Sequence, residues 1–127
     1  MPTGLRNERL YGPDPQDPRF PAEAQFDLVV EGSSLDKLAR QGDLIRCLDV
    51  DLAEVEISDG DIVVIERRRG DDIELLGKRA IKQGDDLELC SESTRDFWRE
   101  PVIRHSQKRR LAGEVRIIGK VLYAYRK

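Results

Sequence analysis

The sequence has few of the residues on which metal and histidine chemistry depend. It contains one histidine, His105, and two cysteines, Cys47 and Cys90. Catalysis by a bound metal and by a Ser-His-Asp triad are both poorly supported by so few side chains. We therefore expect no metal and no cofactor. The cysteines are too few for a disulfide framework and lie in apolar stretches, which predicts that both are buried strand residues.

Long apolar runs are also missing, so we expect no membrane partner. The start of the chain lacks the basic and apolar regions of a signal peptide, which indicates a cytoplasmic protein. The 25 acidic and 22 basic residues leave a net charge of -3, which argues against broad nucleic-acid binding by this domain. The basic run over 104–110 is expected to be a solvated loop. No helix pair suits a helix-turn-helix, so a DNA-reading module is expected to be absent from this chain.

Prolines divide the chain into two parts. Five of the six prolines fall within the first 21 residues, where apolar periodicity is weak. We expect residues 1–25 to be a linker or an extended arm and residues 26–127 to form one domain. In that domain, short apolar segments alternate with Gly-Asp turns, and helical periodicity is confined to residues 34–41. The expected fold is mainly β, with twisted, partly closed antiparallel sheets. The predicted strands cover residues 26–31, 43–50, 61–68, 72–80, 85–90 and 114–125.

The last strand, residues 114–126, has apolar residues on both faces. Simple alternation assigns Val115, Ile117, Val121 and Tyr123 to one face and Ile118, Leu122 and Ala124 to the other. We expect one face to pack on the core and the other on a second copy, giving a two-fold dimer through the C-terminal region. Trp98 and Phe97 are expected to anchor the loop around them.

Three small residues, Gly32, Ser33 and Ser34, follow the first predicted strand. Glycine tolerates turns and serine caps short helices, so a structural role is the common explanation. A serine at a corner between a strand and a helix can also be a nucleophile, because backbone N–H groups gather there. Ser34 is therefore a candidate nucleophile.

If histidine is not the base, a serine nucleophile needs another one, and a desolvated lysine can serve. Lys37 has a Ser-x-x-Lys spacing from Ser34, but a short polar surface helix explains it equally well. Lys78 shares a strand face with Leu76 and Ala80, so it could be buried. Burial disfavours the ammonium form and leaves a fraction of the lysine able to accept a proton. Most strand lysines nevertheless extend to solvent.

The order of several segments resembles the C-terminal domain of LexA-like serine peptidases, which include LexA, UmuD and phage repressors. The resemblance runs from about Phe26 to the end and rests on four segments, "FDLVVEGSSL", "GDLIRCLDVDLAEVEISDGDIVVIER", "IELLGKRAIKQGDDLELCSES" and "IIGKVLYAYR". The family's Gly-x-Ser-Met signature is matched by residues 32–35, with leucine in place of methionine. The resemblance thus implies the LexA/signal-peptidase type of fold, with Ser34 as nucleophile and Lys78 as base.

The resemblance also implies a mechanism. Neutral Lys78 would take the proton of Ser34, and the backbone N–H groups of Ser33 and Ser34 would stabilise the oxyanion. The substrate in this family is the protein's own linker, and DNA is bound through a separate helix-turn-helix domain as part of the SOS response. Relatives cut an Ala-Gly or Cys-Gly bond, whereas the X-Gly bonds of this arm are Thr3-Gly4 and Tyr11-Gly12. We therefore expect the chain to begin near or after the cleavage point.

Two functions fit these sequence features. The first is the self-cleaving peptidase and dimerisation domain of a LexA-like or phage-type repressor. The alternative is a non-catalytic module that uses the same fold to dimerise or to dock a partner. A buried Lys78 within hydrogen-bond reach of Ser34 would favour the enzyme. A third possibility, an unrelated β-barrel binding domain, requires these two residues to lie far apart.

Overall fold

The computed structural model describes residues 5–13, 16–31, 37–90, 103–106, 111–112 and 115–126. Strands dominate it, as the alternating apolar segments predict. The elements, in chain order, are β1 (Leu10–Tyr11), a 3-10 turn (Ala22–Ala24), β2 (Gln25–Val29), β3 (Leu44–Asp49), α1 (Val50–Ala53), β4 (Ile62–Arg69), β5 (Asp72–Gln83), β6 (Asp86–Cys90), β7 (Ile103–Ser106), β8 (Leu111–Ala112) and β9 (Val115–Tyr125).

The six predicted strands correspond to β2, β3, β4, β5, β6 and β9. The turns between them also form where glycine was expected. Gly42, Gly60, Gly70 and Gly84 all have positive φ, a conformation that glycine adopts without steric cost. The helix predicted over 34–41 is wrong in its described part, because Lys37 and Leu38 form a turn. The loop of Phe97 and Trp98 lies outside the described residues.

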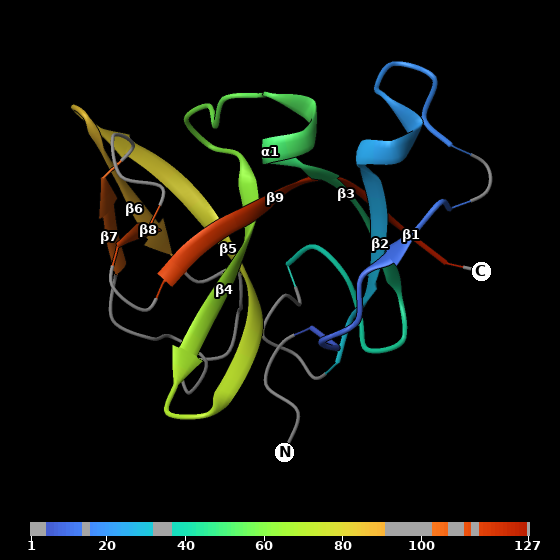
Figure 1. Ribbon diagram of the computed structural model, residues 1–127, viewed down its shortest axis with the longest axis horizontal. Helices are drawn as coiled ribbons and strands as arrows, with labels where there is room; N and C mark the ends of the chain where they lie inside the picture. Colours follow the sequence, from blue (N-terminus) through green and yellow to red (C-terminus); the bar gives the residue numbers. More distant parts are fainter. Residues whose placement is uncertain are drawn as a thin grey trace.

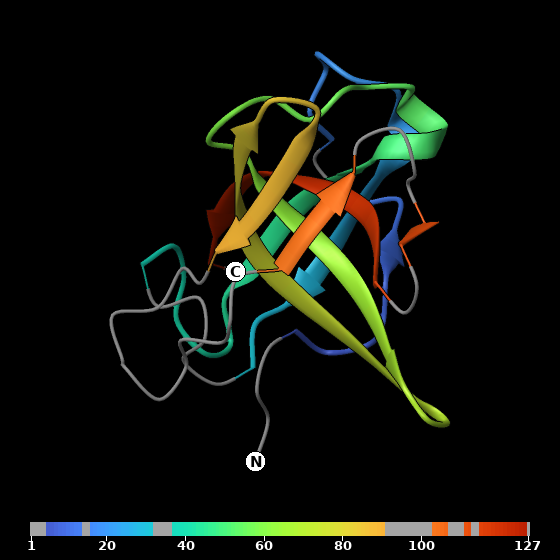
Figure 2. The same ribbon diagram turned by 90° about the vertical axis from the view of Figure 1, so that its left-hand side faces the viewer.

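All strand pairs are antiparallel and belong to one sheet, in the order β1-β2-β3-β9-β4-β5-β6-β7, with β8 beside β9. The C-terminal strand β9 lies centrally and separates β1, β2 and β3 from β4, β5, β6 and β7 (Figure 1). The long β4–β5 hairpin projects from the body in the second view (Figure 2). The mainly antiparallel β architecture is therefore confirmed.

No ladder in the described part of the chain joins the two ends of this sheet. Leu5 instead links two inner parts of the sheet, with one isolated bridge to Val30, just after β2, and another to Leu75 in β5. A single residue of the N-terminal segment therefore links the end of β2 to β5, while the sheet formed by the described strands stays open.

Two apolar clusters lie on opposite faces of the central strands, since neighbouring residues of a strand point to opposite faces. Val64 and Leu75 belong to the first cluster, whereas Val63 and Leu76 belong to the second. Burial on both faces explains why β4 and β5 carry nearly continuous apolar runs. The first cluster also contains Phe26, Leu28, Val30, Ala39, Ile45, Cys47, Ile118 and Leu5, and the second contains Ile65, Ala80, Leu87, Leu89 and Ile117.

The two faces predicted for the last strand are corrected by two register shifts in β9. Pairing skips one residue between Gly119 and Ile117, and another between Tyr123 and Val121. An extra residue of this kind reverses the alternation beyond it. As a result, Val121 packs against the first cluster rather than sharing a face with Ile117, which belongs to the second.

Residues ahead of β2 pack closely on the sheet. Leu10 and Tyr11 pair with Asp27 and Phe26. The amide of Gln25, completely buried, donates to the carbonyl of Asp17 at 2.7 Å, and its oxygen accepts from the N–H of Asp17 at 2.8 Å. This pair of hydrogen bonds holds the segment before β2 against the start of the strand. None of the helices in the described ranges has the length and apolarity needed to cross a membrane.

Candidate functional site

Lys78 is buried in the middle of β5, with a relative exposure of 6%. It lies opposite Val63 of β4, and its neighbours on the same strand face, Leu76 and Ala80, belong to the second apolar cluster. The expectation that this lysine is buried is therefore met. Burial of this kind is a physical requirement for a lysine that acts as a base.

The other lysines with described side chains differ from Lys78. Lys37 and Lys82 are exposed. Lys120 forms an ion pair with Asp61, with 3.1 Å between Nζ and the carboxylate. Lys37 sits in a turn and its side chain is exposed. The Ser-x-x-Lys spacing therefore does not provide a desolvated base.

Ser33 and Ser34, the residues expected at the nucleophile and oxyanion positions, lie outside the described residues. The chain that leads to them is described as far as Glu31, and the chain that leads to Lys78 is described throughout β5. Both run beside Leu5, which pairs with Val30 on one side and with Leu75 on the other. Adjacent strands lie about 4.8 Å apart, so these two backbones approach within roughly 10 Å. Val30 lies four residues before Ser34, and Leu75 lies three before Lys78.

The gap between these two backbones is occupied by the N-terminal segment Leu5–Arg9. From here on, the arm means only this segment and not the whole of residues 1–25. The N–H of Leu5 donates to the carbonyl of Leu75 at 3.1 Å, and the N–H of Arg6 donates to the carbonyl of Val29 at 2.9 Å. The arm thus makes backbone contacts with both walls. We call the gap it fills, between Val29–Glu31 and the first half of β5, the seam.

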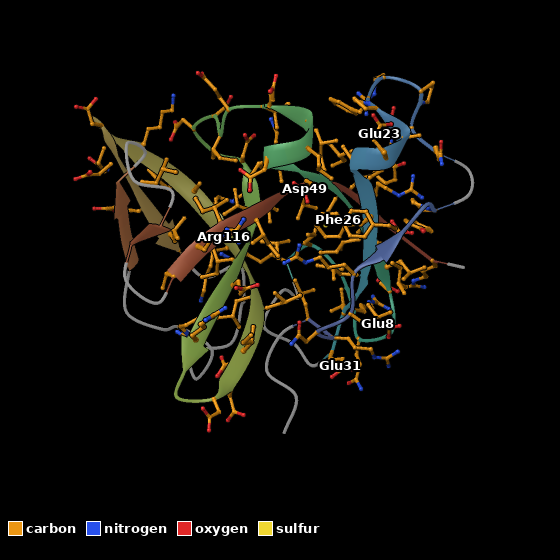
Figure 3. All side chains as sticks on the ribbon, viewed as in Figure 1. Glu8, Glu23, Phe26, Glu31, Asp49 and Arg116 are labelled. Carbon is orange, nitrogen blue, oxygen red and sulfur yellow. The ribbon has the colours of Figure 1, made fainter. Side chains whose placement is uncertain are left out.

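Two side chains of the arm form ion pairs with the sheet and the residues next to it. Arg6 contacts Glu31 at 2.8 Å, and Arg9 contacts Glu66 of β4 at 3.3 Å. Glu31, two residues beyond β2, lies near one end of that strand, whereas Asp49 lies toward the other end (Figure 3). The hydroxyl of Tyr11 donates to Asp49 at 2.8 Å. The segment from Arg6 to Tyr11 therefore runs the length of β2.

A buried polar network lies on the face of β2 and β3 opposite the first apolar cluster, and it was not predicted from the sequence. The guanidinium of Arg46 in β3 donates to Asp27 of β2 at 2.6 Å, and both side chains are almost completely buried. Arg46 also donates to the hydroxyl of Tyr123 at 3.2 Å, and Tyr125 donates to Asp27. Its guanidinium lies over the rings of both tyrosines. Burial and the hydrogen bond to Asp27 raise the pKa of Tyr125 above its usual value.

This network follows the register of the sheet. Leu10, Asp27, Arg46 and Tyr123 are successive partners across β1, β2, β3 and β9. Opposite charges in the middle of two apolar segments were the available signal. That signal became meaningful once β2 and β3 were known to pair in this register.

The cysteines are both free; Cys47 is buried in β3 and Cys90, at the end of β6, is partly buried. Burial raises the pKa of the Cys47 thiol well above its usual value, so it is kept as a neutral apolar residue. The prediction of two buried strand cysteines holds fully for Cys47. The side chain of His105 lies outside the described part of the structure. Across the described ranges, no cluster of three or more histidine, cysteine and acidic side chains could hold a metal ion.

Comparison with family models matches residues 11–122 to the family described as Peptidase S24-like. The match includes β5 with Lys78 and the stretch containing Ser34. A search of curated proteins gave no match.

Proposed function

Because the chain belongs to the Peptidase S24-like family, whose members are serine peptidases, we propose that it hydrolyses a peptide bond with Ser34 as nucleophile and Lys78 as base. The observation that carries this proposal is the burial of Lys78 among Val63, Leu76 and Ala80. An enzyme that keeps a lysine away from water in this way favours the neutral amine that a base requires.

In the proposed reaction, Nζ of Lys78 takes the hydroxyl proton as Oγ of Ser34 attacks the peptide carbonyl. The N–H groups of Ser33 and Ser34 stabilise the oxyanion, and the amine of the cleaved peptide leaves with the proton. Water then hydrolyses the ester on Ser34, and Lys78 again serves as base. A substrate that belongs to the same chain reacts at a high effective concentration, so a slow catalytic pair can suffice.

The wider setting is part of the same proposal. The chain is the peptidase and dimerisation part of a LexA-like or phage-type repressor in the cytoplasm, and its substrate is its own linker. Residues 26–127 form the domain, and residues 1–25 are the end of that linker. DNA is bound by a helix-turn-helix domain that is not part of this chain. The close packing of residues 5–13 against β2 supports a linker that docks on its own domain.

Replacement of the proposed base tests the mechanism. Lys78→Ala and Ser34→Ala should each abolish cleavage of a linker-extended chain, followed by electrophoresis. Lys78→Arg should be equally inactive, because arginine keeps the charge but cannot accept a proton. Lys37→Ala, the matched exposed lysine, should cleave at the normal rate. The wild-type rate should rise from neutral to mildly alkaline pH, since a protonated amine cannot act as base.

An active Lys78→Arg variant would contradict the assignment of the base. Loss of activity in Lys37→Ala would contradict it as well. If all variants and the wild type fail to cleave under these conditions, the non-catalytic docking module is the better description of this chain.

A further inference from the structure

We propose that the seam between β2 and β5 is a peptide-binding groove whose leucine pocket is filled by Leu5, so that the arm excludes peptides supplied in trans. The inference rests on the proposed function, because the groove is the approach to Ser34 and Lys78. It goes further in naming the side chain that the groove selects and the segment that blocks it.

One wall of the groove is an open strand edge. Along one side of β5, β4 pairs with residues 72–79, whereas on the other side β6 pairs only with residues 79–83. In the described part of the chain, the ladder on that second side is therefore missing over the first half of β5. The backbone N–H of Leu5 donates to the carbonyl of Leu75 there. The side-chain amide of Asn7 donates to the carbonyl of Ile73 at 3.4 Å. An open edge of this kind is a template for an extended peptide.

The other wall is the end of β2. Arg6 donates to Val29, and Leu5 pairs with Val30. Consecutive arm residues thus hydrogen-bond in opposite directions, Leu5 toward β5 and Arg6 toward β2. This alternation is the pattern of a strand inserted between two others. Because backbone groups alternate along β5, those of Gly77 face the same side as those of Leu75, one residue before Lys78.

Leu5 is the anchor of the arm. It is 7% exposed and belongs to the first apolar cluster, whereas Arg6, Asn7 and Glu8 are exposed. The neighbouring ion pair of Arg6 with Glu31 is solvent-exposed, and such pairs contribute little to stability. Docking therefore depends on one buried leucine and a few backbone hydrogen bonds, the pattern of a short peptide held by a single hot spot.

An arm tethered next to its groove has a large kinetic and thermodynamic advantage over a free peptide. Short flexible tethers give effective concentrations in the millimolar range. A peptide at micromolar concentration would therefore bind only when the tethered arm docks weakly. The groove would then favour peptides that place leucine where Leu5 lies.

Binding of a fluorescent peptide with the sequence of residues 1–13 tests the inference. The protein carries Ser34→Ala throughout, so that anisotropy reports binding and not cleavage. Leu5→Ala in the protein should weaken its own arm and increase affinity for the peptide at least ten-fold over the Ser34→Ala parent. The matched control is Leu10→Ala, because Leu10 lies in the same 1–13 stretch but is 37% exposed. This change should leave the affinity unchanged. A peptide that itself carries Leu5→Ala should not bind to either protein.

Equal and weak binding by a folded Leu5→Ala protein and its parent would overturn the inference and leave Leu5 as a core residue. Hydrogen exchange provides a second measurement in case Leu5→Ala does not fold. In the wild-type chain, the amides of Leu5 and Arg6 should exchange at least 100-fold faster than those of the β4–β5 ladder. Exchange of the arm amides at the rate of global unfolding would also overturn the inference. Neither measurement requires peptidase activity, so an inactive Ser34–Lys78 pair would not affect the result.

Discussion

At the scale of single residues, Asp27 and Arg46 form an ion pair whose two charges are both almost completely buried. Each charge has lost its water, and each depends on the other and on the two tyrosine hydroxyls. Such a pair contributes little net stability compared with apolar residues, but removal of one partner leaves an uncompensated charge.

Asp27→Ala should therefore destabilise the protein by about 3–5 kcal/mol in urea unfolding. The matched control is Asp51→Ala, which removes the partner of Arg116 in a pair whose side chains are both nearly half exposed. That change should cost less than about 1 kcal/mol. Similar costs for the two variants would mean that Asp27 and Arg46 are not as desolvated as the structure indicates.

Lys78 and Asp27 illustrate what the sequence could and could not predict at this scale. Burial of Lys78 follows from local alternation with Leu76 and Ala80, which any strand imposes. The pairing of Asp27 with Arg46 requires the register of β2 against β3, which neither segment specifies alone. The same limit applies to Leu5, whose bridge partners, Val30 and Leu75, come from distant parts of the chain.

At the scale of elements, the segment before β2 is secured by charge as well as by Gln25. Arg19 donates to Asp17 through its side chain and its backbone N–H, and these hydrogen bonds lower the pKa of Asp17 to about 2. An unfolded aspartate has a pKa of about 3.9. The stabilising effect is therefore complete above about pH 4 and is lost as the pH falls toward 2.

Thermal unfolding should reveal this dependence. At pH 6, Asp17→Asn should unfold at a lower temperature than the wild type, and the difference should shrink as the pH falls to 2. Glu23→Gln, an exposed acidic residue of the same segment, should follow the wild-type curve at each pH. A constant difference between Asp17→Asn and the wild type across the range would contradict the role of the Asp17 charge.

Most strands were predicted because their signals are local, namely alternation bounded by glycines with positive φ such as Gly42 and Gly60. The register shifts in β9 are not local, since one belongs to its pairing with β3 and the other to its pairing with β4. The short strands β1 and β8 were not predicted, and neither was β7, which shows that the loop expected over 104–110 is wrong for residues 104–106. A two-residue strand has no periodicity, and β1 forms because β2 offers it an edge.

At the scale of the whole molecule, the last part of β9 has one edge without a ladder partner in the described structure. Residues 119–125 pair with β3, whereas pairing with β4 ends at Lys120. In the described structure, the far edge of Val121–Tyr125 therefore has no ladder partner, and Tyr123 at its centre is 38% exposed. Exposed edges with tyrosine favour association, and a two-fold pair would join identical strands antiparallel.

We expect sedimentation velocity at roughly 10 μM to show a dimer, a concentration well above the dissociation constants of specific interfaces. Tyr123→Ala should raise the dissociation constant at least ten-fold. The control is Leu52→Ala, which truncates a leucine that is 59% exposed. It should leave the dissociation constant unchanged, because Leu52 lies on α1 and not on the edge of Val121–Tyr125. A wild-type monomer at this concentration would rule out the dimer.

The central position of β9 also constrains the order in which the protein acquires its structure during synthesis. Apart from the bridges of Leu5, the half-sheets β1-β2-β3 and β4-β5-β6-β7 are joined through this C-terminal strand. Its partners in β3 lie 70 or more residues earlier, a separation typical of slowly folding topologies. On the ribosome, both halves must wait with open edges until Val115–Tyr125 has emerged, so the nascent chain is exposed to aggregation and to proteases until its final strand inserts.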